Sequence, residues 1–343
     1  MKAVFLTKER KIIIEDILKP EIKNKTDVLV GIKSVGICGS DIHYYLEGKI
    51  GDQIIEDKII LGHEAAGLVV EVGEGVRNLK KGDRVAIEPG ISCGKCEQCV
   101  IGKPNLCPYV IFFGTPPVDG ALKEFVVMPH THLIPLPDGL DYDCGVLSEP
   151  LAIGLYGVKL SGLSVGEDVA IIGAGPIGLS ALFSAKLAGA KRIFVSDLYQ
   201  ARLDMAKKLG ADVTVLATKE NIVDVVMKET SGRGVDIGYE AAGEQETFNQ
   251  ATQVVKIGGK SVIFGIPAQD KMEFRASVVR RKELQILNVR RSAHTTKLAL
   301  DLIKKNNVFS KLVTHMYELN DVEEAIKLVA EYKSGVIKAV VRM

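Results

Sequence analysis

A glycine-rich turn at residues 173–178, with the sequence GAGPIG, restricts the fold more than any other stretch of the chain. The apolar run before it, residues 168–172, predicts a strand, and residues 179–188 after it predict a helix. A second predicted strand leads to Asp197, 19 residues after the last glycine of the turn. A strand, a glycine turn, a helix and an acid at this distance are typical of a dinucleotide-binding unit.

Each part of this unit has a physical task in binding a dinucleotide. Gly173 permits a tight turn, Gly175 lets the backbone approach the pyrophosphate, and Gly178 lets the helix pack close to the sheet. The free N–H groups at the start of the helix bind the negative charge. The expected cofactor contacts are the turn, the acid and a nearby arginine: Gly173, Gly175, Pro176, Ile177, Gly178, Asp197 and Arg202.

Asp197 predicts which nicotinamide dinucleotide binds. Its carboxylate accepts hydrogen bonds from the ribose hydroxyls of NAD and repels the 2′-phosphate of NADP. Like charges brought together cost several kcal/mol, so NAD is the expected cofactor. An alternative stays open, in which Asp197 only caps the helix that follows it, a role worth about 1 kcal/mol.

The pattern of strands and helices divides the chain into two parts. After about residue 151, strand-like and helix-like runs alternate and give about six strands, which predicts a parallel, doubly wound sheet. Residues 1–150 contain short apolar runs cut by glycine, proline and charge, which predicts a mostly β domain. The last apolar run, residues 337–341, is expected to pack back on that first domain. The expected domains are therefore residues 1–151 with 292–343, and residues 152–291.

Four of the six cysteines lie close together in the β-rich part: Cys93, Cys96, Cys99 and Cys107. Four thiolates at this spacing have the number and softness of a closed, tetrahedral structural zinc site. An iron–sulfur cluster is the main alternative, because the first three cysteines also fit the spacing of a ferredoxin. However, seven residues separate Cys99 from Cys107, where the ferredoxin run has three.

A second group of possible metal ligands is spread along the first domain. The stretch GICGSDIH at residues 36–43 places a thiol, a hydroxyl, a carboxylate and an imidazole within six residues, and further candidates follow it. Cysteine, histidine and carboxylate side chains hold a catalytic zinc with one position left open. We therefore expect Cys38, His63 and one or both of Glu64 and Glu149 to converge on a metal.

The composition argues against several classes of partner. The 343 residues carry 44 Lys and Arg against 43 Asp and Glu, so no net field attracts nucleic acid or anionic lipid. The start of the chain lacks an apolar run long enough for a signal peptide, and the most apolar window, residues 169–183, is too short for a membrane span. We expect a cytoplasmic protein whose partners are small molecules or copies of itself, with no nucleic acid and no membrane.

Taken together, these motifs resemble the zinc-containing medium-chain dehydrogenases over essentially the whole chain. The matching segments, in the order of the family, are GICGSDIH at 36–43, GHEAAG at 62–67, KGDRVAIEP at 81–89, the four-cysteine lobe, EPLA at 149–152 and GAGPIG at 173–178. The chain is most similar to the polyol branch, because simple alcohol dehydrogenases place a cysteine where Glu149 falls. The resemblance implies an α/β fold, with a GroES-like β-rich catalytic domain and a Rossmann, doubly wound parallel-sheet domain.

The resemblance also implies roles for individual residues. Ser40 matches the hydroxyl beside the substrate oxygen, His43 matches the residue that passes its proton to solvent, and Asp41 matches a carboxylate that orients His63. Glu149 is implied as a catalytic residue and a direct or water-mediated ligand, so the ranking of the two glutamates stays open. The implied cofactors are NAD and two zinc ions, one catalytic and one structural.

The implied reaction is the oxidation of a secondary alcohol of a polyol, such as sorbitol or xylitol, to a ketone. The expected substrate contacts are Tyr44, Phe112, Arg290 and Arg291. The polyol branch usually has an Arg-Tyr pair where this chain has two arginines. Arg291 can bind a carboxylate in a bidentate manner, which makes a sugar acid such as an aldonate or ketogluconate an alternative substrate. Equally, Arg291 can be a surface or subunit-contact charge.

Two further alternatives concern the kind of protein. Threonine-type dehydrogenases share the cysteine, histidine-glutamate and four-cysteine pattern. The other alternative is a non-enzymatic NAD-binding protein on the same fold. The presence of all the expected zinc ligands argues against it. The family implies a homo-oligomer, either a tetramer or a dimer.

Overall fold

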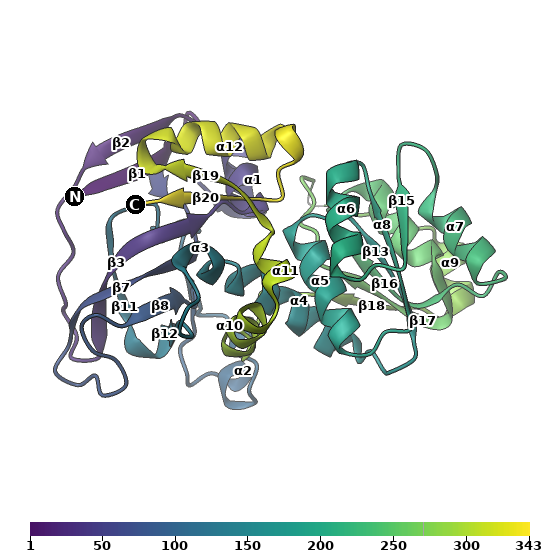
Figure 1. The fold of residues 1–343 in the computed structure, drawn as a ribbon, viewed down its shortest axis with the longest axis horizontal. Helices are drawn as coiled ribbons and strands as arrows, with labels where there is room; N and C mark the ends of the chain where they lie inside the picture. Colours follow the sequence, from purple (N-terminus) through teal and green to yellow (C-terminus); the bar gives the residue numbers. More distant parts are fainter. Residues whose placement is uncertain (270) are drawn as a thin grey trace. The chain divides into compact units, whose positions relative to one another are not determined.

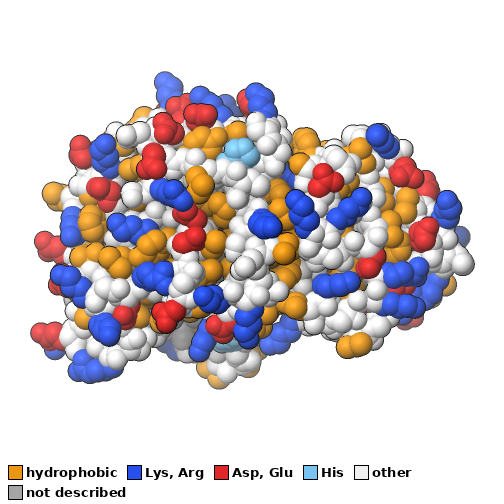
Figure 2. All heavy atoms as spheres, viewed as in Figure 1, with side chains coloured by type: hydrophobic (Ala, Val, Ile, Leu, Met, Phe, Trp, Pro, Cys, Tyr) orange, Lys and Arg blue, Asp and Glu red, His pale blue; other side chains and the backbone are white. Residues whose placement is uncertain are grey.

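The computed structural model of the chain describes residues 1–269 and 271–343 and contains two compact units (Figure 1). The first unit consists of Met1–Glu149 together with Thr296–Met343, and the second of Pro150–Thr295. On the face shown in Figure 2, acidic and basic side chains are interspersed, as the nearly balanced charge leads one to expect. No helix among the described residues is long and apolar enough to cross a bilayer.

The second unit is a six-stranded parallel sheet with helices packed on it. Its elements are β13 Asp168–Ile172, α5 Pro176–Leu187, β14 Arg192–Asp197, α6 Gln200–Leu209, β15 Val213–Leu216, α7 Ile222–Glu229, β16 Val235–Glu240, α8 Gln245–Gln253, β17 Val255–Ile263, α9 Ala276–Lys282 and β18 Gln285–Asn288. The strand order is β15-β14-β13-β16-β17-β18, so the first strand of the unit lies inside the sheet. This is the predicted doubly wound arrangement.

The burial of the strands explains why they form a parallel sheet. Every residue of β13 and of β16 is buried, so both faces of these strands are covered. In β13 four apolar residues follow Asp168 without a break, which is typical of a strand buried on both faces. Such runs need cover on both faces of the sheet. Helices α5 and α6 pack together and lie in front of the sheet in Figure 1, and α8 packs against β13, β16 and β17. Because β13 and β14 are parallel neighbours, their carboxyl ends lie side by side. The glycine turn follows β13, and Asp197 ends β14.

The first unit is built on antiparallel strands. Its main elements are β1 Lys2–Thr7, β2 Ile12–Asp16, β3 Asp27–Gly36, α1 Gly39–Glu47, β6 Lys58–Ile60, β7 Glu64–Val72, β8 Arg84–Ile87, β11 Phe125–Pro129, β12 Leu133–Pro135 and α3 Tyr142–Gly145, followed after the second unit by α10 Thr296–Lys305, α11 Asn307–Ser310, β19 Val313–Glu318, α12 Val322–Ala330 and β20 Lys338–Arg342. Helix α4 Ser148–Ser161 begins at the end of this stretch and lies mostly in the second unit. The larger sheet has the order β12-β8-β7-β3-β20-β19, with β11 also on β3, and the smaller one has the order β2-β1-β6. A large apolar cluster that includes Val30, Val35 and Val341 forms much of the core of this unit.

The terminal strand joins the first unit, as its apolar run predicts. Strand β20 pairs antiparallel with β3, with Val340 opposite Gly36. Strand β19, which the sequence pattern did not predict, pairs parallel with β20 at the edge of the sheet. Its residues alternate between half-buried and exposed, so the apolar signal that identifies a buried strand is weak there.

A buried carboxylate ties together the starts of two central strands in the second unit. Asp236, the second residue of β16, accepts hydrogen bonds from Arg233 Nη2 at 2.6 Å, Lys256 Nζ at 2.5 Å and the backbone N–H of Asp168 at 2.9 Å. Burial alone would raise its pKa, but the bonds from Arg233 and Lys256 outweigh burial and lower the pKa of Asp236 to about 2. Asp236 therefore favours the folded state whenever it is ionised.

We expect Asp236→Asn to lower the free energy of unfolding at neutral pH by roughly 1–2 kcal/mol, allowing for solvent screening at the half-exposed Arg233. Because the pKa is lower in the folded state, this stabilisation is complete above about pH 5 and is lost as the pH falls from about 4 towards 2. Urea unfolding of both proteins at several pH values measures the difference. Glu220→Gln, at an exposed position, is the control. A difference that does not shrink in acid would contradict this role.

Candidate metal centres and cofactor turn

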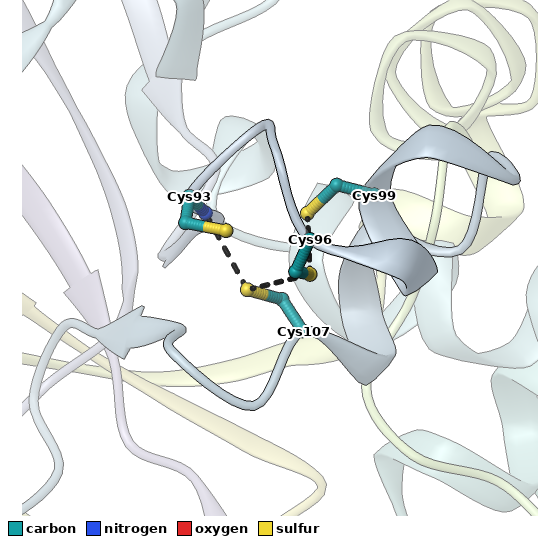
Figure 3. Close-up of side chains that lie close together, drawn as sticks. All are labelled: Cys93, Cys96, Cys99 and Cys107. Carbon is teal, nitrogen blue, oxygen red and sulfur yellow. Dashed lines mark hydrogen bonds between the residues drawn. The ribbon is translucent and has the colours of Figure 1, made fainter.

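The four clustered cysteines converge on one point, as Figure 3 shows. The ligand atoms of Cys93, Cys96, Cys99 and Cys107 all lie within 4.8 Å of one another. Cys96 Sγ lies 3.5 Å from Cys99 Sγ and 3.7 Å from Cys107 Sγ. Four convergent sulfur atoms at these distances fit a closed tetrahedral zinc site.

The backbone around Cys93 prepares this site for thiolates. Gly94 has a φ of 71°, a left-handed conformation that turns the chain sharply between the first two cysteines. The N–H groups of Lys95 and Cys96 then donate to the Cys93 sulfur, and together they lower the pKa of the Cys93 thiol to about 6. Hydrogen bonds that favour the thiolate also favour metal binding.

We expect Cys107→Ser to remove one zinc per chain and to loosen the lobe from residue 93 to 107. Cys107 is the buried member of the four, and the short helices of this lobe bury little apolar surface of their own. Metal binding is then a large part of what orders the lobe, so amide hydrogen exchange there should become about 100-fold faster or more. Metal analysis and exchange mass spectrometry measure both effects. Cys144→Ser, outside the cluster, should change neither, and an unchanged zinc content in Cys107→Ser would contradict a structural zinc.

A second group of ligand atoms lies in the same unit, where Cys38, His63 and Glu64 come within 4.8 Å of one another. Cys38 is the N-cap of α1, and its backbone N–H donates to Asp41 Oδ2 at 2.9 Å. His63 and Glu64 stand where the chain enters β7, and both are buried. Burial, with a contribution from the Glu64 carboxylate, raises the pKa of the Cys38 thiol to about 12. Such a thiol needs a cation beside it to ionise, as a metal ligand does.

The surroundings of His63 are arranged for a ligand. Its Nδ1 is buried, has no hydrogen-bond partner among the described residues, and lies 3.8 Å from Asp41 Oδ1. Asp41 is held in turn by the backbone N–H groups of Cys38 and Gly62. An imidazole with a buried unpartnered nitrogen beside a fixed carboxylate is the arrangement found around metal-bound histidine.

Glu149 lies close to this group but outside the set within 4.8 Å that the described residues form. It is near the start of α4, it is 7% exposed, and its Oε2 has no hydrogen-bond partner in the described part of the chain. Burial raises the pKa of Glu149 well above its usual range, His63 lowers it, and Glu64 raises it further. The donor set of thiol, imidazole and two carboxylates fits a zinc ion.

Sequence reasoning missed one residue of this site, Lys338. Its side chain is 1% exposed, and its Nζ donates to both carboxylate oxygens of Glu64, at 2.7 and 2.6 Å, and to the carbonyl of Ile37 at 3.0 Å. One signal could have revealed it, because a lysine stands inside the apolar run at residues 337–341 that was predicted to be a buried strand. A lysine buried in a strand needs a charged partner.

The expected catalytic and substrate residues near this set come from two elements, α1 and β10. Ser40 and His43 both lie on α1, and the Ser40 side chain hydrogen-bonds the Cys38 thiol. Phe112 is on β10 (Ile111–Phe112), with its ring centroid 5.7 Å from that of His63. Tyr44 is 1% exposed and belongs to the apolar core of the first unit.

The two expected arginines, Arg290 and Arg291, belong to the second unit, in the segment after β18. Arg290 is exposed and Arg291 is half-buried. Arg291 has a φ of 56°, a conformation that a residue with a side chain rarely adopts. Their part in substrate binding stays a prediction.

The glycine turn has the geometry that its motif predicts. Gly173 has a φ of 96°, and a Cβ at Gly178 would lie 1.8 Å from the Gly173 carbonyl oxygen, so only glycine fits. A Cβ at Gly175 would meet only Arg202 Nη1, at 3.8 Å, which leaves this stretch of backbone open to a ligand. Pro176 and Ile177 begin helix α5, with proline in its first turn.

Asp197 links this turn to the helix that follows it. Its Oδ2 accepts a hydrogen bond from the N–H of Ala174 at 2.7 Å, and its Oδ1 accepts one from the N–H of Tyr199 at 2.9 Å. The buried Arg202 places Nη1 3.8 Å from Asp197 Oδ2. Asp197 therefore bonds the chain at the entrance to α6, as the capping alternative suggests, and it also anchors the glycine turn.

Comparison with known proteins places these sites in a family. The family model for the alcohol dehydrogenase GroES-like domain matches residues 24–138, and the one for the zinc-binding dehydrogenase domain matches residues 176–305. The chain is 38% identical to the sorbitol dehydrogenase of Bacillus subtilis over 342 residues, which cover 99% of this chain and 97% of that protein. It is 37% identical to the D-xylulose reductase A of Aspergillus niger, over 91% of this chain and 89% of that protein.

A solved structure agrees with these relatives. The 2R,3R-butanediol dehydrogenase of Bacillus subtilis superposes with a TM-score of 0.88 at 34% identity, over 100% of this chain and 99% of that one. The predicted fold class, with its GroES-like and Rossmann domains, is confirmed. The predicted zinc and nicotinamide cofactors fit the family and the two sites described above. The chain belongs to the zinc-containing medium-chain dehydrogenase family, in the branch of the sorbitol dehydrogenases and D-xylulose reductases.

Proposed function

We propose that the chain oxidises a secondary alcohol of a neutral polyol, of the sorbitol or xylitol class, to the ketone and transfers the hydride to NAD. The observation that carries this proposal is the convergence of Cys38, His63 and Glu64 in a buried site. Relatives that match nearly the whole chain are named for sorbitol and for D-xylulose. Their names favour a neutral polyol over a sugar acid or threonine, and over a protein without activity.

The metal ligands in this proposal are Cys38, His63 and a carboxylate from Glu64 or Glu149. A zinc ion held there lowers the pKa of a substrate hydroxyl, which makes removal of the hydride from its carbon feasible at neutral pH. Asp41 Oδ1 lies 3.8 Å from His63 Nδ1, where a small approach would let it orient the ring for ligation.

The proton of the substrate hydroxyl needs a route away from the buried site. Ser40 hydrogen-bonds the Cys38 thiol, so its hydroxyl lies beside the ligand set and is the first acceptor. His43 lies three residues further along α1, on the same side of the helix, and an imidazole can both accept and release a proton. The free backbone N–H groups of Ile177 and Gly178 at the start of α5 would bind the NAD pyrophosphate, and Asp197 would accept hydrogen bonds from the adenosine ribose.

A substrate panel tests the proposal. NADH formation is measured with sorbitol, xylitol, threonine, a simple secondary alcohol and an aldonate, and the products are identified by chromatography. We expect the polyols to react at least ten times faster in kcat/KM than the other compounds and to give ketoses. Turnover of the aldonate alone, lost in Arg291→Ala, would overturn the proposal in favour of a sugar acid. Arg291→Ala should change the polyol rates little.

We also propose that the chain forms a homo-oligomer, a tetramer or a dimer. Strand β18 is an edge strand, so its outer N–H and C=O groups are available to a second copy of the chain. Light scattering after gel filtration measures the assembly, and a monomer would overturn this proposal.

A cytoplasmic location is proposed because four convergent metal-binding thiols need a reducing compartment, and fractionation of cells tests it. The proposed domains are residues 1–151 with 292–343, and residues 152–291.

A further inference from the structure

The buried ion pair between Glu64 and Lys338 spans three strands of one sheet. Glu64 begins β7, Lys338 begins β20, and β3 lies between these two strands. Within the sheet, Gly36 of β3 stands opposite both Glu64 and Val340. The two charged side chains therefore meet over the middle strand, at Gly36.

Gly36 makes this contact possible. A Cβ at this position would lie 2.3 Å from Glu64 Oε2 and 3.2 Å from the Glu64 Cβ, so any side chain here would displace the Glu64 carboxylate from its present position. The absence of a side chain leaves the space that the Glu64 carboxylate occupies on its way to Lys338. The ion pair therefore depends on the packing of the three strands and is not a surface contact.

Lys338 has no hydrogen-bonding capacity left for another residue. An ammonium group has three N–H donors, and here they meet Glu64 Oε1 at 2.7 Å, Glu64 Oε2 at 2.6 Å and the Ile37 carbonyl oxygen at 3.0 Å. Both oxygens of Glu64 are therefore engaged by a cation. Glu149 differs, because its Oε2 has no partner within the described residues. A metal bound by Cys38 and His63 would therefore have two carboxylates nearby. Glu64 is already paired with Lys338, whereas Glu149 has one oxygen without a partner among the described residues.

We propose that Lys338 is a positioning residue that competes with the catalytic zinc for Glu64. The proposal rests on the proposed function only in assigning that zinc to Cys38, His63 and the carboxylates. The ammonium group draws electron density from both Glu64 oxygens and repels a nearby metal ion, so Glu64 binds the zinc weakly and the site keeps less negative charge. A zinc ion with fewer strong anionic donors is more electrophilic towards a substrate hydroxyl. Lys338 thereby favours Glu149 as the second carboxylate of the site.

Lys338→Met tests this directly, because methionine has a similar length and no charge. With the ammonium group gone, only the zinc compensates the buried Glu64 carboxylate. Competition with a chelator of known affinity should then show zinc bound at least ten times more tightly than in the wild-type protein. Cobalt substitution gives an independent spectroscopic readout, since an added carboxylate ligand weakens the visible absorption bands of a four-coordinate site. Lys338→Arg, which keeps the charge, should stay within about threefold of wild type.

Two further variants separate this role from general damage. In Lys338→Met/Glu64→Gln the gain in zinc affinity should disappear, because the freed carboxylate is absent. Lys333→Met, at an exposed lysine that pairs with Glu331, should leave the zinc affinity unchanged. The Cys38→Ser protein gives the baseline, because it keeps only the four-cysteine site.

The outcomes decide between the possibilities. A Lys338→Met protein that folds only when zinc is present supports the proposal, since the zinc then replaces the ammonium group. Weaker or unchanged zinc binding, a gain that survives Glu64→Gln, or failure to fold even with zinc would overturn it. A wild-type protein that holds one zinc per chain would instead refute the assignment of the catalytic metal site, which is a separate failure.

Discussion

Cys38→Ser is expected to remove one zinc per chain and to lower kcat/KM for the polyol by about 10³-fold or more. The Cys38 thiol is one of three ligand atoms that lie within 4.8 Å of one another, and a hydroxyl is a far poorer zinc ligand than a thiolate. Zinc supplies several kcal/mol of stabilisation to the developing alkoxide, and each 1.4 kcal/mol is about tenfold in rate. Metal analysis and steady-state kinetics on the same preparation measure both effects.

Cys144→Ser is the matched control for this substitution. Cys144 is half-buried, lies outside both groups of ligands, and keeps its proton because burial raises the pKa of its thiol to about 11. Its replacement should leave two zinc ions per chain and normal turnover. A Cys38→Ser protein that retains both zinc ions and more than about a tenth of the activity would show that the catalytic metal lies elsewhere.

Asp197→Ala is expected to lower the preference for NAD over NADP by about 100-fold or more. The carboxylate stands at the end of β14 beside the glycine turn, where it opposes a 2′-phosphate, and a like-charge contact costs several kcal/mol. Its removal also takes away the carboxylate that lies 3.8 Å from Arg202 Nη1, which would let that guanidinium group attract the phosphate. The ratio of kcat/KM values for the two cofactors measures the change.

The same substitution should weaken NAD binding itself. Asp197 Oδ2 bonds the N–H of Ala174 inside the turn, so its loss should raise the KM for NAD by about tenfold. Asp204→Ala, at an exposed acid on α6, is the control and should change neither cofactor. Unchanged discrimination in Asp197→Ala would mean that the residue serves only as a cap.

Local patterns predicted much of the fold, because each buried strand carries its own signal. The patterns of residues 168–172 and 235–240 each predict a strand, and the structure has β13 and β16 there, with every residue buried. The ends of helices and strands were predicted less well where a helix pattern and a strand pattern overlap. The sequence of residues 247–256 predicts a helix, yet α8 ends at Gln253 and β17 begins at Val255. Val254 and Val255 are fully buried against the sheet, and this packing outweighs the helix pattern.

The candidate sites also differ in how well the sequence predicts them. The four cysteines are close in sequence, and spacing alone predicts that they meet. Cys38, His63 and Glu64 were grouped from their residue types, and the family resemblance supported the grouping. No local spacing predicts that they meet, because a fold is needed to bring α1 and β7 side by side. Lys338 could not be assigned a partner at all, since its contact with Glu64 spans 274 residues and depends on the missing side chain of Gly36. Long-range pairs of this kind leave no local pattern.

The most direct test of the account is a zinc titration of the metal-depleted protein, followed by the rate of NADH formation from sorbitol or xylitol. The first equivalent should fill the four-cysteine site and restore little activity, and the rate should rise with the second equivalent until two zinc ions are bound per chain. That result would show that polyol oxidation depends on zinc bound at the site of Cys38, His63 and the two glutamates. Full activity with one zinc per chain, or no polyol turnover with two, would contradict it.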